Sequence, residues 1–344
     1  MSRASGVVGI GIIGAGIMGR SHAASISCDP RARLVGVASV PFASAQELAA
    51  IYGVAFATDD YRELLARPDI DLVSIATPDH LHYDICTAAT EQRKNFLVEK
   101  PLTTNLAQAD GLIAAVRRSG VIAMTCFNHR WIPAYARASS EIQEGKLGRP
   151  VLAYARKNDR IFVPTEMLSW AASTTPAWFL SCHDVDLVNW FFGDTRATEV
   201  YATAVWGVLR GRGIDTPDAI QAQVRYSDGQ VATFESCWIY PNSYPSMTDS
   251  FIEVVGETGM MHLKRDSEQI ELAHADAFEY PRTSVGAMIH GVQRGAVADA
   301  LHHMVTCVIN QVQPLVTLES SRHVTAILDA LHRSVDSGQA EAVR

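Results

Sequence analysis

The sequence lacks the cysteine spacing of a zinc site or of a disulfide framework. Its six cysteines are scattered through 344 residues without a C-x-x-C pair. Scattered cysteines are typical of proteins from a reducing compartment, where disulfides are rare. We therefore expect neither a bound metal ion nor a disulfide, and a cytoplasmic location. The cysteines are Cys28, Cys86, Cys126, Cys182, Cys237 and Cys307.

An excess of positive charge and a long apolar run are also missing. The 29 lysines and arginines are outnumbered by 37 aspartates and glutamates, which gives a formal net charge of −8. Nucleic acids and anionic membranes bind clustered cationic groups, so we expect neither as a partner. No uninterrupted apolar run of about 18 residues could span a bilayer. Residues 1–8 also lack the apolar core and cleavage site of a signal peptide.

A regular alternation of short apolar runs and helical segments occupies the first part of the chain. The run at residues 7–13 is apolar or glycine throughout, as is typical of a strand buried on both faces. Further runs lie at 34–39, 72–76, 96–99 and 121–127. Strands that alternate with helices predict a parallel sheet with helices on both faces. We assign residues 1–128 to this α/β domain.

After Pro150 the pattern changes to strands with few helices between them. Runs at 151–158, 200–208, 220–226, 230–240, 251–255 and 260–263 predict an open, mostly antiparallel sheet. Asp228-Gly229 is a strong hairpin signal between two of these strands. Helical segments at 290–310 and 319–337 end the chain and could pack back on the first domain. Residues 129–344 are therefore predicted to form an α+β domain.

The segment Gly14-Ala15-Gly16-Ile17-Met18-Gly19 follows the first predicted strand and opens a helix. In this G-x-G-x-x-G pattern the first glycine permits a tight turn, the second lets the backbone approach a pyrophosphate, and the third lets helix and strand pack closely. Free N–H groups at the helix start, around Ile17 and Met18, would face the phosphates. The motif predicts a Rossmann site for NAD or NADP, with a tight turn that binds nothing as the alternative.

Two segments that follow later strands could also contact the cofactor. Ser39 stands where NAD enzymes usually place an acidic residue on the ribose 2′-hydroxyl. Its neutral side chain favours NADP, but no arginine follows to bind a 2′-phosphate, and Ser39 could simply cap the strand; NAD and NADP both stay open. Thr77 and Pro78 lie at the carboxyl edge of the sheet and could line the nicotinamide side. His82 could join them, or lie on a helix surface.

Glu99-Lys100-Pro101 follows the next predicted strand at the same edge. A lysine beside a nicotinamide could hydrogen-bond the reacting oxygen and shuttle its proton. Pro101 would fix the turn, and a cis bond is one way to do so. Asn128 follows a further strand close to this edge. The alternative for Lys100 is a solvated loop residue.

A second candidate for proton transfer lies in the segment 176–192. If this segment is helical, Phe179, His183, Asp186 and Trp190 share one stripe. An aspartate one turn from a histidine can orient the ring and favour its charged form. The alternative is a structural His–Asp pair that braces two domains.

These motifs belong to a longer ordered series that runs through nearly the whole chain. The series continues with Arg130-Trp131-Ile132-Pro133, Gly145-Lys146-Leu147-Gly148-Arg149-Pro150, His183-Asp184-Val185-Asp186, Val254-Val255-Gly256-Glu257 and Pro314-Leu315-Val316-Thr317. Together the segments resemble the glucose-fructose oxidoreductase / inositol dehydrogenase / MocA family of NAD(P)-dependent oxidoreductases. Their order is far more specific than any one motif.

The resemblance implies a Rossmann domain followed by an open-faced sheet domain that often carries subunit contacts. It implies a dehydrogenase of sugars, cyclitols or related polyols, with Lys100 and His183 at the reaction centre and Asp186 beside them. Arg156 and Asn158 fall where related enzymes contact substrate hydroxyls. We expect a homodimer or homotetramer formed through the C-terminal sheet.

One position departs from the family pattern. Inositol-dehydrogenase-like members carry an aspartate four residues before the histidine, and here that residue is Phe179. An apolar ring cannot relay a proton, so either Lys100 and His183 suffice, or Asp184 or Asp186 changes role, or the substrate differs, or catalysis is lost. A dinucleotide-binding sensor, like the yeast galactose-pathway repressors of this family, is therefore one alternative. A nucleotide-sugar ketoreductase or a trans-diol dehydrogenase is another.

Overall fold

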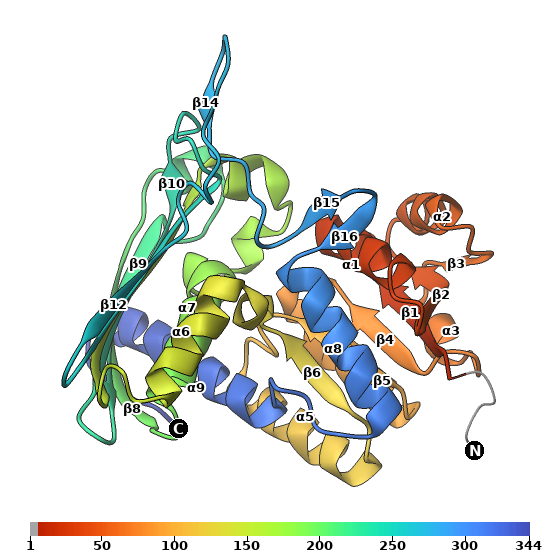
Figure 1. Ribbon diagram of the computed structural model, residues 1–344, viewed down its shortest axis with the longest axis horizontal. Helices are drawn as coiled ribbons and strands as arrows, with labels where there is room; N and C mark the ends of the chain where they lie inside the picture. The colour runs from red at the N-terminus through yellow and green to blue at the C-terminus, as the bar shows by residue number, and fades with distance from the viewer. Residues whose placement is uncertain (1–5) are drawn as a thin grey trace. The chain divides into compact units, whose positions relative to one another are not determined.

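The computed structural model describes residues 6–344, which divide into two compact units (Figure 1). Unit 1 consists of residues 6–131 and Val285–Arg322, and unit 2 consists of Ile132–Ser284 and His323–Arg344. Residues 1–5 lie outside the described residues. They belong to the segment 1–8, for which the sequence predicts no signal peptide. None of the described helices is both long enough and apolar enough to cross a bilayer.

Unit 1 is built on a six-stranded parallel sheet, as the alternating pattern predicted. The strand order is β3-β2-β1-β4-β5-β6. The chain adds strands on one side of β1 first and then on the other side, so the switch point lies between β1 and β4. Ligands of such sheets bind beyond the carboxyl ends of the strands near this point. The central strands β1 and β4 are fully buried because helices cover both faces, and Ser74 is the one polar residue in these two strands. The strands are β1 (Val8–Ile13), β2 (Ala32–Ala38), β3 (Phe56–Thr58), β4 (Leu72–Ile75), β5 (Asn95–Glu99) and β6 (Ala123–Cys126).

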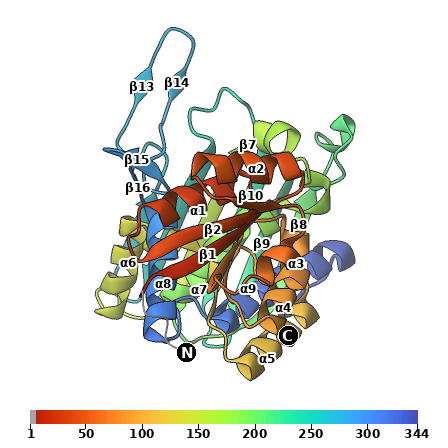
Figure 2. The same ribbon diagram turned by 90° about the vertical axis from the view of Figure 1, so that its right-hand side faces the viewer.

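Two groups of helices cover this sheet (Figure 2). One contains α1 (Ile17–Ser27) and α8 (Ala296–Asn310), which pack against each other. The other contains α3 (Tyr61–Leu65), α4 (His82–Glu91) and α5 (Leu106–Ser119). The remaining helix, α2 (Phe42–Ile51), packs against β2 and β3. The prediction of a helix from residue 290 is wrong for its first six residues, where β15 (Ala287–Ile289) pairs with β16 (Val292–Arg294) around Gly291 in a left-handed conformation (φ 80°).

Unit 2 contains a mixed, mostly antiparallel sheet in the order β12-β11-β7-β10-β9-β8-β17. Only β7 and β10 pair in parallel among the described neighbours in this sheet. The Asp228-Gly229 turn joins β9 and β10 as predicted, with Gly229 at φ 84°. The strands are β7 (Pro150–Arg160), β8 (Ala197–Val205), β9 (Ala219–Tyr226), β10 (Val231–Tyr240), β11 (Thr248–Gly256), β12 (Met260–Lys264) and β17 (Glu341–Ala342).

One face of this sheet is covered by helices and the other is open. Alternate residues of β7, among them Ala153 and Ala155, are buried on the covered face. That face packs against α7 (Cys182–Phe192), and the Ala202 N–H of β8 donates to Ser334 Oγ of α9 (Leu318–Ser337). Helix α6 (Pro133–Gln143) packs on α7. A separate hairpin, β13 (Leu272–Ala273) and β14 (Phe278–Glu279), projects from the unit (Figure 1).

Candidate active site

The glycine turn between β1 and α1 has the geometry that a dinucleotide requires. Gly14 has φ 100°, and a Cβ there would lie 2.4 Å from the Ala76 carbonyl oxygen. A Cβ on Gly19 would lie 1.8 Å from the Gly14 carbonyl oxygen, so helix and turn touch through backbone alone. Gly16 is different, because a Cβ there would meet no protein atom within 4 Å. The turn is therefore closed on the protein side and open at Gly16, where a pyrophosphate would lie.

The start of helix α1 is free to bind an anion. Gly16 is its N-cap residue, and no described side chain caps the first turn. The side chain of Ile17 is 65% exposed, and Met18 is half-buried. Uncapped N–H groups at a helix start carry the positive end of the helix dipole. These residues fit the diphosphate of NAD, as the sequence predicted for this motif.

Ser39 lies beside the glycine turn and contacts it directly. Its hydroxyl accepts a hydrogen bond from the Ala15 N–H at 3.1 Å. The side chain therefore ties the end of β2 to the turn, in addition to any role at the ribose. Val40 follows with 81% exposure. Whether this edge selects NAD or NADP stays a prediction.

The loop after β4 carries Thr77 and Pro78, and both are half-buried. Thr77 Oγ1 is buried and makes no hydrogen bond to any residue from 6 to 344, as is also true of Asn128 Oδ1 after β6. Buried polar atoms without a protein partner are costly, so these two atoms fit contacts with a bound ligand. Together with the glycine turn they place several predicted cofactor contacts at the carboxyl edge of one sheet.

His82 is fully buried at the start of α4, so it is not a surface residue. Its Nδ1 lies 2.7 Å from the Pro101 carbonyl oxygen, and its Nε2 lies 3.1 Å from the Thr77 carbonyl oxygen. The ring thus bridges the loop after β4 and the loop after β5. Burial lowers the pKa of His82 and outweighs the hydrogen bonds and acidic neighbours that favour its charged form.

Lys100 follows the last residue of β5 and is half-buried. Its backbone N–H donates to Glu99 Oε2 at 3.3 Å, and the Lys100–Pro101 peptide bond is cis. The Glu99 carboxylate itself is 5% exposed. Lys100 therefore occupies a turn whose backbone is constrained on both sides, and its role in proton transfer stays a prediction.

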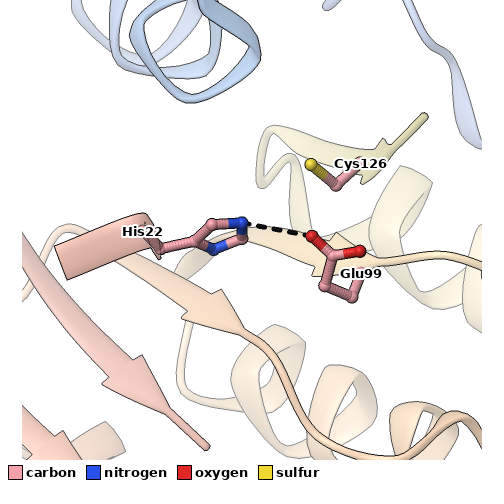
Figure 3. A group of neighbouring side chains, drawn as sticks. All are labelled: His22, Glu99 and Cys126. Carbon is pink, nitrogen blue, oxygen red and sulfur yellow. Dashed lines mark ion pairs between the residues drawn. The ribbon is translucent and has the colours of Figure 1, made fainter. Parts of the chain in front are cut away.

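A buried cluster behind Glu99 was missed by the sequence analysis (Figure 3). His22 of α1 approaches Glu99 Oε1 through Nε2 at 3.1 Å and Ser74 Oγ of β4 through Nδ1 at 2.5 Å. Cys126 at the end of β6 lies beside the same carboxylate, and its thiol helps to lower the pKa of Glu99. One ligand atom from each of His22, Glu99 and Cys126 lies within 4.8 Å of the others. The only sequence signal was a histidine three residues after the glycine motif, on the face of α1 that packs on the sheet.

In unit 2, His183 lies in the first turn of α7 and is 9% exposed, and Asp186 is 1% exposed. The segment before it is a π-helix over Ala177–Ser181, which a plain α-helical reading of 176–192 did not predict. A π-helical turn contains more residues than an α-helical turn. The predicted stripe therefore holds for His183, Asp186 and Trp190, but not for Phe179. Phe179 packs on Trp170 and Trp238, with ring centroids 6.0 and 6.3 Å apart.

Asp184 forms a buried ion pair with Lys157 of β7, and the two side chains are 1% and 2% exposed. Lys157 Nζ also lies 3.3 Å from Ser250 Oγ of β11. Burial raises the pKa of Asp184, although the Lys157 charge acts in the opposite direction. The pair joins the start of α7 to the sheet directly beside His183. Asp184 is therefore engaged in structure, which removes it as a replacement for the missing family aspartate.

The ion pair leads to a stability prediction. We expect Lys157→Met to lower the free energy of unfolding by about 3–5 kcal/mol, because Asp184 would keep a buried charge without its partner. The double variant Lys157→Met/Asp184→Leu should regain most of this loss. Urea unfolding followed by tryptophan fluorescence reports mainly on unit 2, since five of the six tryptophans lie there. An additive loss in the double variant would contradict the pairing.

Arg156 and Asn158 lie on the open face of the unit 2 sheet, opposite to the face that Lys157 presents to α7. Arg156 Nε bonds Asp249 at 2.7 Å, which raises the pKa of Arg156. Asn158 Nδ2 donates to Glu235 at 2.8 Å and to the Tyr240 hydroxyl at 2.9 Å. Within unit 2 the structure thus places these two residues in an acidic cluster, on the other side of the sheet from His183. Their role as substrate contacts stays a prediction.

Lys100 belongs to unit 1 and His183 to unit 2. Their convergence on one substrate, which the resemblance implied, stays a prediction. Each unit nevertheless supplies a half-buried or buried proton-transfer candidate at an ordered position: the end of β5 and the first turn of α7.

Two family models match most of the chain. One, described as an oxidoreductase family with an NAD-binding Rossmann fold, matches residues 8–127, and the other, described as the GFO/IDH/MocA C-terminal domain, matches residues 135–262. An inositol 2-dehydrogenase of Acidothermus cellulolyticus is 32% identical over 74% of this chain and 72% of its own length. A levoglucosan dehydrogenase of Pseudarthrobacter phenanthrenivorans is 28% identical over 78% of this chain and 77% of its own length.

A solved structure has the same fold over nearly its full length. It is the scyllo-inositol dehydrogenase from Lactobacillus casei with bound NAD(H) and scyllo-inositol, with a TM-score of 0.84 and 20% identity. The match covers 98% of this chain and 99% of that chain.

Proposed function

This chain belongs to the GFO/IDH/MocA family of NAD-binding oxidoreductases, and from that membership we propose that it transfers a hydride between the nicotinamide and a hydroxyl-bearing ring carbon of a sugar or cyclitol. It is an NAD(P)-dependent dehydrogenase that acts on CH–OH groups. Residues 1–128 bind the dinucleotide, and residues 129–344 bind the substrate.

The observation that carries the proposal is the arrangement at the carboxyl edge of the unit 1 sheet. The open Gly16 position, the uncapped start of α1, the free Thr77 Oγ1 and the Lys100 turn all lie at the ends of β1, β4 and β5. A dinucleotide laid across this edge has its phosphates at the helix and its nicotinamide towards the later strands.

Lys100 and His183 are the proposed proton-transfer residues. When bound, NAD supplies the hydride acceptor. Lys100 Nζ binds the hydroxyl oxygen of the reacting carbon and takes up its proton as that carbon is oxidised. His183 accepts or passes on the same proton, and Asp186 lies one turn away on the same helix to orient its ring. Glu99 and Pro101 hold the backbone on either side of Lys100.

Phe179 favours a substrate with an apolar face. Its ring forms an aromatic group with Trp170 and Trp238. Such rings pack well against the C–H face of a sugar but offer no hydrogen bond to a hydroxyl. Levoglucosan, the substrate named for one relative, is an anhydro sugar. One face of its ring carries fewer hydroxyl groups than a face of an inositol ring. We therefore place an anhydro sugar before an inositol as the substrate.

The proposal is tested by measuring NADH or NADPH formation at 340 nm with the purified protein. The panel is levoglucosan, myo-inositol, scyllo-inositol and glucose, each with NAD⁺ and with NADP⁺. We expect turnover with at least one ring polyol and the highest kcat/KM with levoglucosan. Binding of NAD without turnover on any member would contradict the dehydrogenase assignment to these substrates and favour a sensor.

The open face of the unit 2 sheet is the proposed subunit contact of a homodimer or homotetramer. Large apolar side chains are exposed there on two strands: Leu152 of β7 is 42% exposed, and Tyr201 and Val205 of β8 are 49% and 61% exposed. Apolar surface spread over a sheet face is typical of a protein interface. Light scattering should give twice or four times the chain mass of 37.4 kDa.

A further inference from the structure

Lys100 sits between two residues whose polar groups are each held by a buried histidine. Glu99 precedes it, with its carboxylate in ion-pair contact with His22, and Pro101 follows it, with its carbonyl oxygen hydrogen-bonded by His82. Both histidines are 0% exposed. The two histidines come from different helices, α1 and α4. Neither position has an obvious packing reason for a polar ring.

The contact between His22 and Glu99 is an ion-pair contact. His22 Nε2 lies 3.1 Å from Glu99 Oε1 without the geometry of a hydrogen bond, and both atoms are buried. Burial acts to raise the pKa of Glu99, but the nearby His22 ring, the charge of Lys100 and the Cys126 thiol together lower it. Burial and the Glu99 charge raise the pKa of the Cys126 thiol well above its ordinary value, so that thiol stays protonated and can donate.

The other oxygen of Glu99 acts on Lys100 itself. Oε2 accepts the Lys100 backbone N–H at 3.3 Å, while Oε1 faces His22. Contacts with α1 and β6 on one side therefore restrain rotation of the Glu99 carboxylate. Its other oxygen, Oε2, can then hold the Glu99–Lys100 peptide in place. The chain of contacts runs from Ser74 through His22 and Glu99 to the backbone of Lys100.

His82 holds the other side of the turn. Its Nδ1 is 2.7 Å from the Pro101 carbonyl oxygen, and its Nε2 is 3.1 Å from the Thr77 carbonyl oxygen. Both partners only accept, and burial lowers the pKa of His82, so the ring is neutral near pH 7 and has one N–H to give. The shorter distance assigns that N–H to Nδ1 and hence to Pro101.

We propose that His22 and His82 are positioning residues that hold Lys100 from both sides, His22 through the Glu99 carboxylate and His82 through the Pro101 carbonyl. This inference rests on the proposed role of Lys100 in proton transfer. A lysine side chain is long and flexible, so its Nζ can be placed accurately only if its backbone is fixed. Misplacement of a reacting group by about 1 Å can cost about 100-fold in rate.

The two histidines use different ring nitrogens, and this difference makes the proposal testable. The amide nitrogen of asparagine falls near the Nδ1 position of a histidine, and that of glutamine falls near Nε2. His22→Gln should therefore keep a nitrogen beside Glu99, whereas His22→Asn loses that contact and keeps only the Ser74 contact. At position 82 the order is reversed: His82→Asn keeps the bond to Pro101, and His82→Gln loses it.

We expect His22→Asn and His82→Gln to lower kcat about 100-fold, with KM and the NAD dissociation constant little changed. His22→Gln and His82→Asn should keep kcat within about threefold of the unmodified enzyme, because each keeps the contact that holds the turn. The assay uses the panel substrate with the highest turnover. A purely structural role would make both substitutions at one position equally harmful, and equal kcat values at either position would overturn the proposal.

A second route avoids the histidines altogether. Cys126→Ser keeps a donor to Glu99, and Cys126→Ala removes it, so only the alanine variant should lower kcat. Cys86→Ala is the matched control, because it removes another fully buried thiol of the same unit that has no contact with this cluster. A loss of kcat in Cys86→Ala equal to that in Cys126→Ala would count against the proposal.

Crystal structures of His22→Asn and His22→Gln separate this inference from the role of Lys100. If Lys100 takes no part in turnover, so that kcat cannot report on its position, displacement of the Lys100 turn in the asparagine variant alone still supports positioning. An undisplaced turn in both overturns it. Retained turnover in Lys100→Met would instead refute the proposed role of Lys100 in proton transfer. In that case the crystal structures alone would test whether the two histidines position Lys100.

Discussion

Lys100→Met is expected to lower kcat by about 10²- to 10⁴-fold, the range that a positioned acid–base group contributes. Methionine preserves most of the length and apolar contacts of the lysine stem, so the turn between Glu99 and Pro101 should persist. The dissociation constant for NAD, measured by protein fluorescence or calorimetry, should change less than threefold, because the glycine turn and the start of α1 are untouched. The measurement is steady-state kinetics with the best panel substrate.

Lys94→Met supplies a matched control at the opposite end of the same strand. Lys94 directly precedes β5, whose other end leads to Lys100, and its Nζ donates to the Arg67 and Ile70 carbonyl oxygens. Its loss should reduce the melting temperature but leave kcat near that of the unmodified enzyme. If Lys94→Met and Lys100→Met reduced turnover equally, the effect would be one of folding, and Lys100 would have no special place in the chemistry.

His183→Ala is the second substitution expected to reduce turnover strongly, again by about 10²- to 10⁴-fold in kcat. His183 stands in the first turn of α7, which the Lys157–Asp184 pair holds against β7. This anchoring fixes the helix backbone beside the ring, so the substitution should remove a functional group without releasing the helix. Circular dichroism and urea unfolding should show a stability loss below that of Lys157→Met.

The control for His183 is His262→Ala. His262 lies on β12 and is paired with Glu253 at 2.7 Å on a half-exposed part of the sheet. Its removal should leave kcat unchanged. Should His183→Ala retain turnover within threefold of this control, His183 would be a structural residue of α7 and Lys100 would act without it.

The elements of the two sheets followed from sequence pattern because burial on one or both faces leaves a periodic trace. The strand at Val8–Ile13 is apolar on both faces, and Asp228-Gly229 needs a backbone that glycine adopts easily. The roles assigned to Gly14, Gly16 and Gly19 also agree with the space around each residue. Such features depend on neighbours within a few residues, which the sequence contains.

The sequence did not indicate what depends on contacts between distant residues. Nothing near Cys126 or Ser74 in the chain shows that both meet a cluster around His22 and Glu99. The π-helical segment at Ala177–Ser181 was equally hidden, because its residues read as an ordinary helix. Alternation along β7 separated Lys157 from Arg156 and Asn158, but only the packing of α7 decided which face was covered.

The amino-acid order alone therefore determined the class of each unit and the glycine turn after the first strand, since these rest on local periodicity and a short motif. It also indicated Lys100 and His183 as candidates for proton transfer, and their roles stay predictions. Tertiary structure decided that His22 lies against Glu99 and His82 against Pro101, the two neighbours of Lys100 in the chain, and that Asp184 is paired with Lys157. The physical reason is that a buried polar group must find its partner in space. That partner can stand anywhere in the chain, so the pairing exists only once the strands and helices have packed.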